Sequence, residues 1–154
     1  MPRQTVAAYG ILDVSSEAFT QNGTIPVRYA CDGDDVSPPL TINKIPAQAK
    51  SLALIVEDPD APGGTWLHWL AWNIPVVKQI GENEVPGDQG MNDFGKISYG
   101  GPCPPSGTHR YIFKVYALDD LLDLTEGSSK AELETAMQNH ILAHGQLTGV
   151  YKRP

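Results

Sequence analysis

The sequence has few cysteines, few basic residues and no long hydrophobic run, and each shortage excludes a class of protein. Only Cys31 and Cys103 occur in 154 residues. They are too few for a disulfide scaffold, and no Cys-x-x-Cys pair indicates a zinc or redox site. Eleven basic residues face 18 acidic ones, for a net charge of −7. Because a nucleic-acid groove needs clustered Lys and Arg to neutralise phosphates, we expect no nucleic-acid partner.

The sequence also lacks the segments that direct a chain to a membrane. No apolar run reaches the length of about 18 residues that indicates a membrane span. The first residues, MPRQTVAAYGILDVSS, do not combine a long apolar segment with a small-residue cleavage site. We therefore expect a cytoplasmic protein or the trimmed form of an exported one. The length and the apolar content of 41% fit one domain over residues 1–154.

Short apolar runs between loops rich in glycine and proline predict a mainly β protein. The 15 glycines and 13 prolines are spread along the chain, as expected for strands joined by ordered loops. The predicted strands are Ser51 to Glu57, Trp66 to Ile74, Tyr111 to Leu118 and Gln146 to Lys152, with weaker patterns at Thr5 to Val14 and Leu40 to Ile42. Trp66 to Ile74 is apolar on both faces, which is typical of a central strand. Strands and helices do not alternate along the chain, so the sequence does not predict a parallel sheet.

One α-helix is predicted near the C-terminus. Ser129 and Glu132 have the spacing of a capping box at the start of a helix. Residues at helical spacing then follow: Leu133, Ala136, Met137, His140, Ile141 and His144. Gly145 is of the type that commonly ends a helix. The sequence therefore predicts a helix that continues to His144.

Polar residues stand at the ends of three predicted strands. The segment DPDAP, residues 58–62, follows the first strand, and His68 lies in the second. His109 and Tyr111 begin the third strand, on one face of it, after the loop YGGPCPPSGT. Period two also places four residues on one face of the second strand: Trp66, His68, Leu70 and Trp72. If these strand ends meet, they bring together two carboxylates, two imidazoles, a phenol and the backbone amides of residues 101–103.

Several of these residues also have a purely structural interpretation. Asp60 can cap its own turn, and His68 can be a core histidine between tryptophans. His140 and His144 can belong to the packing face or the last turn of the predicted helix. A functional site is favoured by the coincidence of polar residues at three strand ends.

The residue types favour anion binding over catalysis. No Gly-x-Ser-x-Gly motif is present, and nothing near Cys103 indicates an activated nucleophile. His68 and His109 could bind zinc with a carboxylate, but no close ligand pair indicates a metal. Asp58 and Asp60 are too close in sequence to flank a sugar. What remains is a small anion pocket with two imidazoles and a phenol as donors, in which Asp58 or Asp60 orients a histidine and favours its charged form.

Together the motifs resemble the phosphatidylethanolamine-binding protein family, which includes the Raf kinase inhibitor protein. The motifs are DPDAP, W-x-H-W and Y-G-G-P-C-P-P-S-G-T-H-R-Y, while CDGDDVSPPL, NDFGK and GQLTGVYKR are similar to the bacterial and archaeal branch. The resemblance implies an antiparallel β-sandwich with one or two peripheral helices near the C-terminus, and a pocket for phosphate or a phospholipid head group. Carried over by motif, the ligand-binding residues are Asp58, Asp60, Trp66, His68, Gly101, Cys103, His109 and Tyr111.

We therefore expect a non-enzymatic protein that binds a small anion or phospholipid head group, without a cofactor or metal. The family includes inhibitors of kinases and serine proteases, so a protein partner of either kind is implied by analogy. Two alternatives stay open. One is a hydrolase or transferase that uses His68, His109 and an aspartate, and the other is an interaction protein whose pocket is vestigial.

Further expectations concern the surroundings of the pocket. The Ala61–Pro62 peptide is expected to be cis, since two prolines frame a tight turn. Cys31 and Cys103 are expected within bridging distance, because each lies in a polar loop beside the candidate site. Mammalian relatives cover the pocket with a C-terminal helix that is missing before Pro154, so an open apolar rim and a homodimer are expected. Anion binding is expected to weaken as pH rises, because neutral imidazole has one N–H donor instead of two.

Overall fold

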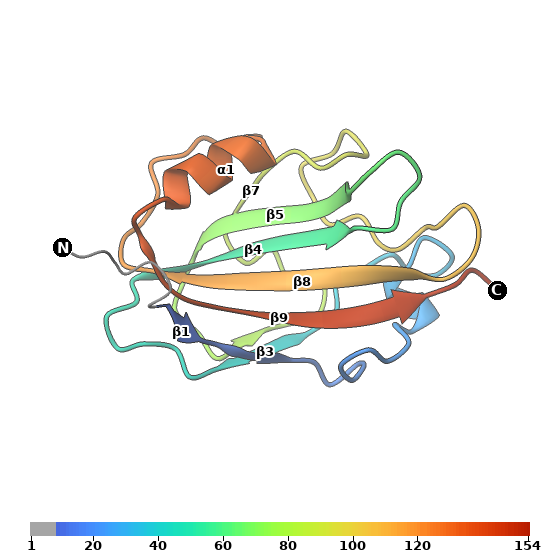
Figure 1. The fold of residues 1–154 in the computed structure, drawn as a ribbon, viewed down its shortest axis with the longest axis horizontal. Coiled ribbons are helices and arrows are strands. Elements are labelled where there is room, and N and C mark those ends of the chain that lie inside the picture. The colour runs from blue at the N-terminus through green and yellow to red at the C-terminus, as the bar shows by residue number, and fades with distance from the viewer. Residues whose placement is uncertain (1–8) are drawn as a thin grey trace.

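Two β-sheets and one α-helix make up the fold of the computed structural model, which describes residues 9–154. The larger sheet has six strands in the order β1-β9-β8-β4-β5-β7, and the smaller has three in the order β2-β3-β6 (Figure 1). The elements are β1 (Gly10–Ile11), β2 (Asp13–Ser15), the 3-10 helix η1 (Val27–Tyr29), β3 (Leu40–Asn43), β4 (Ser51–Asp58), β5 (Trp66–Ile74), β6 (Gln79–Ile80), β7 (Asp88–Gln89), β8 (His109–Leu118), α1 (Lys130–Met137) and β9 (Ile141–Tyr151). Paired strands are antiparallel except β1 and β9. The predicted β-sandwich with a peripheral helix near the C-terminus is confirmed.

The central strand β4 buries side chains on both faces of the larger sheet. Leu52 and Leu54 belong to the core between the two sheets. Ala53 and Ile55 alternate with them and pack in a second cluster with Leu133 of α1. Each fully buried leucine or isoleucine contributes about 1.5–3 kcal/mol to folding. The larger sheet is therefore the middle layer, with the smaller sheet on one face and α1 on part of the other (Figure 1).

The structure confirms the long predicted strands and lengthens most of them. β4 adds Asp58 to its predicted range, β8 begins at His109, and β9 begins at Ile141 instead of Gln146. The weak pattern at Leu40 to Ile42 corresponds to β3. The pattern at Thr5 to Val14 falls on two short strands in different sheets, β1 and β2, and its first four residues lie outside the described part of the chain.

The predicted helix ends earlier than expected. Its capping box is present: Glu132 N donates to Ser129 Oγ at 3.1 Å, and Ser129 N donates to Glu132 Oε1 at 2.8 Å. The helix stops at Met137, and Asn139 then takes a left-handed φ of 69°. The expected continuation through the two histidines was wrong. The chain from Ile141 onward pairs with β8 over its whole length, so cross-strand hydrogen bonds replace those of a helix.

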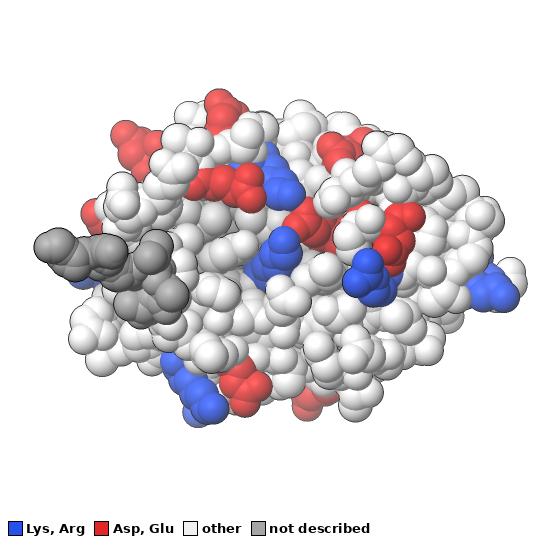
Figure 2. Space-filling view, viewed as in Figure 1, with Lys and Arg blue, Asp and Glu red and all other residues white. Residues whose placement is uncertain are grey.

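The outer face of the larger sheet carries charges of both signs. Figure 2 shows acidic and basic side chains interspersed on this face. Glu57 of β4 accepts hydrogen bonds from Lys114 and, at 2.6 Å, from Lys130. Burial alone would raise the pKa of Glu57, but the two lysines lower it. Within residues 9–154, none of the helices has both the length and the apolar character needed to cross a bilayer.

Candidate functional site

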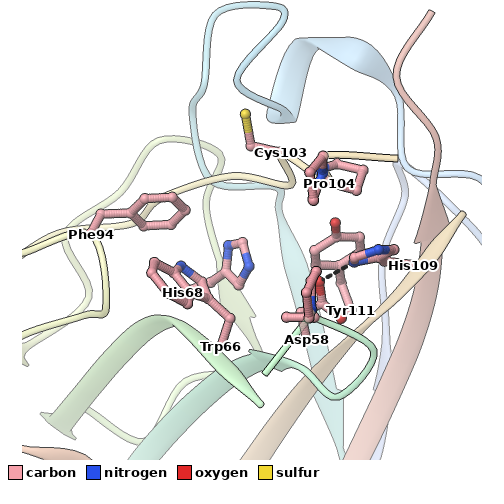
Figure 3. A pocket seen from close by; sticks show the side chains of 11 residues that line it. Asp58, Trp66, His68, Phe94, Cys103, Pro104, His109 and Tyr111 are labelled. Atoms are coloured by element: carbon pink, nitrogen blue, oxygen red, sulfur yellow. Dashed lines mark hydrogen bonds and ion pairs between the residues drawn. The ribbon is translucent and has the colours of Figure 1, made fainter. Parts of the chain in front are cut away.

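Three strand ends meet at one end of the larger sheet (Figure 1). Side chains from these ends and from neighbouring loops line a cavity of about 190 Å³ (Figure 3). β4 ends at Asp58, β5 begins opposite it, and β8 begins beside it. The cavity brings together most of the predicted site residues: Asp58, Trp66, His68, Cys103, His109 and Tyr111. The predicted residues Asp60 and Gly101 do not line it.

A β-bulge directs His68 into the cavity. The pairing of β4 with β5 skips His68, which has no partner opposite it. An extra residue of this kind reverses the alternation of side chains along a strand. As a result Trp66 and His68 line the cavity, whereas Leu70 and Trp72 belong to the cluster beneath α1. The prediction that these four residues share one face was wrong, because strict period two does not allow for the bulge.

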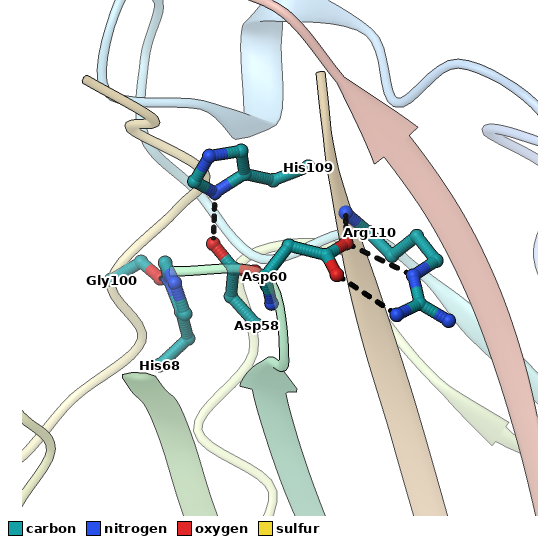
Figure 4. A network of polar contacts seen from close by, with 6 residues as sticks. All are labelled: Asp58, Asp60, His68, Gly100, His109 and Arg110. Atoms are coloured by element: carbon teal, nitrogen blue, oxygen red, sulfur yellow. Dashed lines mark hydrogen bonds and ion pairs between the residues drawn. The ribbon is translucent and has the colours of Figure 1, made fainter. Parts of the chain in front are cut away.

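The carboxylate of Asp58 orients the ring of His109. His109 Nδ1 lies 2.6 Å from Asp58 Oδ2, and both side chains are buried (Figure 4). An ionised carboxylate only accepts hydrogen bonds, so the proton is on Nδ1 and Nε2 is left for a ligand. The other oxygen of Asp58 accepts a hydrogen bond from the backbone N of Asp60 at 2.7 Å. Asp58 therefore has the predicted role of an aspartate that sets the tautomer of a histidine.

Asp60 binds Arg110 instead of the cavity groups. Its Oδ2 accepts hydrogen bonds from the backbone N and from Nε of Arg110, each at 2.9 Å, and its Oδ1 accepts one from Nη2 at 2.8 Å (Figure 4). These bonds lower the pKa of Asp60 to about 2. His109 and Arg110 are neighbours on β8, so their side chains leave opposite faces of the strand. The two aspartates of DPDAP therefore contact residues on opposite faces of β8.

His68 is held in its neutral form by its surroundings. Its Nδ1 donates to the carbonyl oxygen of Gly100 at 2.7 Å, and the ring packs edge-on against Phe94 and Tyr111, with centroids 5.2 Å apart in each case. Burial lowers the pKa of His68, although the Gly100 carbonyl and the charge of Asp58 act in the opposite direction. The expected stabilisation of the charged form by a contacting aspartate does not apply to this ring.

The hydroxyl group of Tyr111 has no hydrogen-bond partner. Within residues 9–154 it is the only buried side-chain nitrogen or oxygen atom without a hydrogen-bond partner. Figure 3 shows the Tyr111 ring beside Asp58 and His109. Burial, and next the negative charge of Asp58, raise the pKa of Tyr111, so the phenol keeps its proton. Because the hydroxyl lines the cavity, it is available to donate a hydrogen bond to a ligand there.

A disulfide connects the loop before β8 to the segment after η1. Cys31 and Cys103 are bonded, with Cα atoms 5.4 Å apart, which confirms their predicted proximity. Nearby, Gly101 N donates to Asp35 Oδ1 at 2.8 Å. A Cβ atom on Gly101 would lie 2.2 Å from the carbonyl oxygen of Tyr29. The glycine therefore allows close packing of two backbone segments, and its amide is already engaged by Asp35.

The DPDAP turn reverses the chain without a cis peptide bond. No cis bond occurs among residues 9–154, so the predicted cis Ala61–Pro62 bond was wrong. Gly63 and Gly64 have φ values of 84° and 124°, and Gly64 N donates to the Ala61 oxygen at 3.1 Å. A trans proline followed by a glycine with positive φ forms a common tight turn. The glycines provide the reversal that was expected from the proline.

Part of the cavity wall was not predicted from the sequence. The additional lining residues are Ala61, Pro62, Phe94, Pro104 and Pro105. Phe94 comes from the loop between β7 and β8; it is 40% exposed and packs edge-on against Trp66 with centroids 5.6 Å apart. An aromatic residue inside a polar loop is the sequence signal that could have identified it. These residues give the cavity an apolar wall next to its polar groups.

The cavity can exchange hydrogen bonds and protons, but it has no activated nucleophile. Cys103 is oxidised in the disulfide, and the phenol of Tyr111 keeps its proton. Among the described residues, no group of three or more His, Cys, Asp or Glu side chains is arranged to hold a metal ion. The groups that a ligand would meet are therefore the Tyr111 hydroxyl, the Nε2 atoms of His68 and His109, and the Asp58 carboxylate.

Sequence comparisons show which known proteins the chain is similar to. Residues 15–152 match the family described as phosphatidylethanolamine-binding protein. The chain is 52% identical over 149 residues to a UPF0098 protein of Pyrococcus abyssi, covering 90% of this chain and 84% of that protein. It is 47% identical over 150 residues to a UPF0098 protein of Methanothermobacter thermautotrophicus, covering 92% of this chain and 99% of that protein.

Solved structures share the whole fold. A phosphatidylethanolamine-binding protein homologue from Chlamydia trachomatis superposes with a TM-score of 0.90 at 42% identity, covering 94% of this chain and 99% of that chain. Escherichia coli YbcL, described as a new member of the mammalian family, superposes with a TM-score of 0.85 at 32% identity, covering 93% of this chain and 99% of that chain. The similarity thus spans nearly the whole chain.

Proposed function

This chain belongs to the phosphatidylethanolamine-binding protein family, and from this membership and the geometry of the cavity we propose that it is a non-enzymatic protein that binds a small phosphate-type oxyanion. The oxyanion is either free or part of a phospholipid head group. Oxygen atoms of such a ligand accept hydrogen bonds in several directions, which suits a cavity whose polar groups come from three different strands.

The observation that carries the proposal is the unpaired hydroxyl of Tyr111. A buried donor without a partner is uncommon in folded proteins and calls for an explanation. The hydroxyl lies in a cavity that also contains Asp58 and the free ring nitrogens of His68 and His109. A bound oxyanion gives the Tyr111 hydroxyl the acceptor that it lacks.

The charge of the cavity is compatible with an anion. Of the two aspartates in DPDAP, only Asp58 lines the cavity, and its carboxylate contacts His109. The charge of Asp60 is paired with Arg110 outside it. When His109 takes up a proton, its pair with Asp58 has no net charge, so the repulsion of an anion by the carboxylate is compensated.

Calorimetric titration with inorganic phosphate tests this proposal. We expect saturable binding, and we expect Tyr111→Phe to weaken it about two- to tenfold, the equivalent of one neutral hydrogen bond of about 0.5–1.5 kcal/mol. Tyr116→Phe is the matched control, because Tyr116 is on the same strand but faces away from the cavity. Absence of any anion binding would contradict the proposal and favour an interaction protein with a vestigial pocket.

One observation favours the enzymatic alternative and gives it a direct test. The buried contact between Asp58 and His109 resembles the pair that activates a general base. A hydrolase would therefore use His109 to activate water. A panel of phosphate and carboxylate esters should show no turnover above background. Turnover that is lost in His109→Ala would overturn the non-enzymatic proposal.

A further inference from the structure

We propose that His68 makes the cavity select oxyanions that still carry a proton, such as a phosphate monoester with one P–OH group, over oxyanions of the same shape and charge that carry none, such as a sulfate monoester. This inference rests on the proposed function, because it concerns which member of the oxyanion class the same cavity prefers. His68 is thereby assigned as a residue that determines specificity through the acceptor character of its Nε2 atom.

The tautomer of His68 follows from its hydrogen bond to the backbone. The partner of Nδ1 is the carbonyl oxygen of Gly100, at 2.7 Å. A carbonyl oxygen can only accept, so the ring proton of neutral His68 is on Nδ1. None of the hydrogen bonds formed by the described residues uses Nε2 of this ring. In the neutral ring Nε2 therefore offers a lone pair to the cavity, and it attracts a donor and repels an unprotonated oxygen.

The groups around His68 keep the ring neutral. Phe94 and Tyr111 pack against its two sides, and Tyr111 keeps its own proton. Burial lowers the pKa of His68, and it outweighs the backbone of Gly100 and Gly101 and the negative charges of Asp58 and Asp35, which favour the charged ring. The remaining titratable group in the cavity, His109, has its own carboxylate partner in Asp58. Burial thus maintains Nε2 as an acceptor at neutral pH.

The cavity therefore offers a bound oxyanion two kinds of contact. The Tyr111 hydroxyl is a donor at every pH at which the phenol is protonated. His109 Nε2 is a second donor when its ring is charged and, like His68 Nε2, an acceptor when its ring is neutral. His68 Nε2 is an acceptor and needs a proton on the ligand. A phosphate monoester has its second pKa near about 6, so close to that pH it carries both oxygens that accept and an O–H that donates. A sulfate monoester carries only accepting oxygens.

The contact between His68 Nε2 and a ligand O–H predicts strong discrimination between phosphate and sulfate monoesters. A site built to hydrogen-bond a ligand O–H rejects the analogue that lacks it, because a buried polar group is then left unpaired. With a sulfate monoester, His68 Nε2 would face an oxygen lone pair unless the ring first took up a proton. Sulfate binding should therefore improve as pH falls through the titration of His68, whereas a phosphate monoester already has the necessary proton.

The test compares methyl phosphate with methyl sulfate by calorimetry on the wild-type protein. At about pH 5.5 methyl phosphate is mainly a monoanion with one P–OH group, and methyl sulfate is a monoanion of similar size without one. We expect methyl phosphate to bind at least tenfold more tightly wherever nitrogen NMR of the unbound protein shows a neutral His68 ring. We expect the ratio of the affinity for methyl phosphate to that for methyl sulfate to fall at lower pH, where charged His68 becomes a donor. We expect the affinity for methyl phosphate to fall above the second pKa of that ligand.

Two variants assign the discrimination to His68. His68→Gln has a side-chain amide that can donate as well as accept, so the preference for methyl phosphate should drop below about threefold. Tyr111→Phe is the control, because it removes a donor that both ligands use and should weaken both without changing their ratio. Nitrogen NMR of the wild-type ring gives a measurement that needs no variant, and Nε2 should stay unprotonated when methyl phosphate is bound.

The outcomes separate this inference from the proposed function. If methyl sulfate binds as tightly as methyl phosphate while the His68 ring of the unbound protein is neutral, or if NMR shows Nε2 protonated in the methyl phosphate complex, the inference is wrong although the anion site stands. If His68→Gln keeps the full preference, another residue is responsible. If neither ligand binds at any pH, the proposed function itself fails.

Discussion

At the scale of single residues, the behaviour of the cavity depends on which ring nitrogen of each histidine carries the proton. In both rings Nδ1 is committed, to Gly100 in His68 and to Asp58 in His109. The Nε2 atoms face the ligand without a proton unless the rings are charged. A monoanion that brings no proton of its own therefore depends on proton uptake by the protein.

Acetate affinity should consequently fall as pH rises. Binding of acetate favours imidazolium over imidazole, so the complex takes up protons, and the burial that lowers the pKa of His68 makes this uptake more costly near neutrality. Calorimetry from about pH 5.5 to about pH 8 measures the slope. His109→Ala should weaken acetate binding and flatten its dependence on pH. Tyr111→Phe should weaken acetate binding but leave the pH dependence unchanged. Acetate affinity that does not vary with pH would show that the histidines are not the donors.

At the scale of elements, the turn between β4 and β5 is attached to the start of β8 at two points. Asp58 contacts His109, and Asp60 contacts both the backbone and the guanidinium group of Arg110. The regular pairing of β4 with β8 ends at Glu57, so the two carboxylates continue the connection by side-chain contacts. This arrangement holds the Asp58 carboxylate where it can orient His109.

Asp60→Asn should lower stability only in a defined pH range. The bonds from Arg110 lower the pKa of Asp60 from 3.8 to about 2. A lowered carboxyl pKa stabilises the folded state above pH 3.8, and this contribution is lost as pH falls toward 2. Because the pair is largely exposed, we expect a loss of a few tenths to about 1 kcal/mol.

Urea unfolding between neutral pH and about pH 2 measures this contribution. Wild type and Asp60→Asn should differ near neutrality and converge at the acid end of the range. Asp123→Asn is the matched control, since Asp123 is exposed and far from the turn in sequence. A constant difference across the whole range would mean that ionisation of Asp60 is not the cause.

At the scale of the whole molecule, one covalent link joins distant parts of the chain beside the cavity. Cys31 and Cys103 are separated by 72 residues, and Cys103 lines the cavity. A cross-link over a long loop restricts the unfolded chain, which by the loop-entropy estimate is worth about 4 kcal/mol. The bond therefore contributes to overall stability as well as to the position of the cavity wall.

Replacing both cysteines with serine should lower the free energy of unfolding by about 2–4 kcal/mol. Urea unfolding without reductant measures the difference from wild type. A reducing agent should destabilise the wild type by a similar amount and leave the double variant unchanged. Free thiols in the native protein purified without reductant would contradict the structural assignment.

The apolar rim of the cavity leads us to expect a homodimer. Trp66 and Phe94 line the cavity, are 38% and 40% exposed, and pack edge-on against each other. Exposed apolar residues grouped beside a cavity commonly mark an interface. Light scattering at micromolar concentration should give twice the mass of the chain. Phe94→Glu should shift the protein to monomer, whereas Leu121→Glu, at an exposed site beyond the other end of β8, should not. A monomeric wild type would end this expectation.

Much of the local structure was determined by the sequence itself. Apolar runs such as Ser51 to Glu57 specify strands, because only an extended chain buries both sets of alternating side chains in a middle layer. Ser129 and Glu132 specify the start of α1 through a contact over three residues. The polar groups at the strand ends were predictable for the same reason, since each stands directly beside its own apolar run.

The tertiary structure decided the features that depend on contacts between residues distant in sequence. The bulge at His68 arises in the pairing of β5 with β4, and no local sequence pattern predicts it. It nevertheless determines on which face of β5 the His68 ring lies. The choice between helix and strand after Asn139 was settled by pairing with β8, whose backbone groups were available along the full length of β9. Asp58 and Asp60 are alike in sequence, but adjacent residues on β8 direct them to opposite sides. In each case the deciding hydrogen bonds cross between separate segments, where sequence spacing carries no information about geometry.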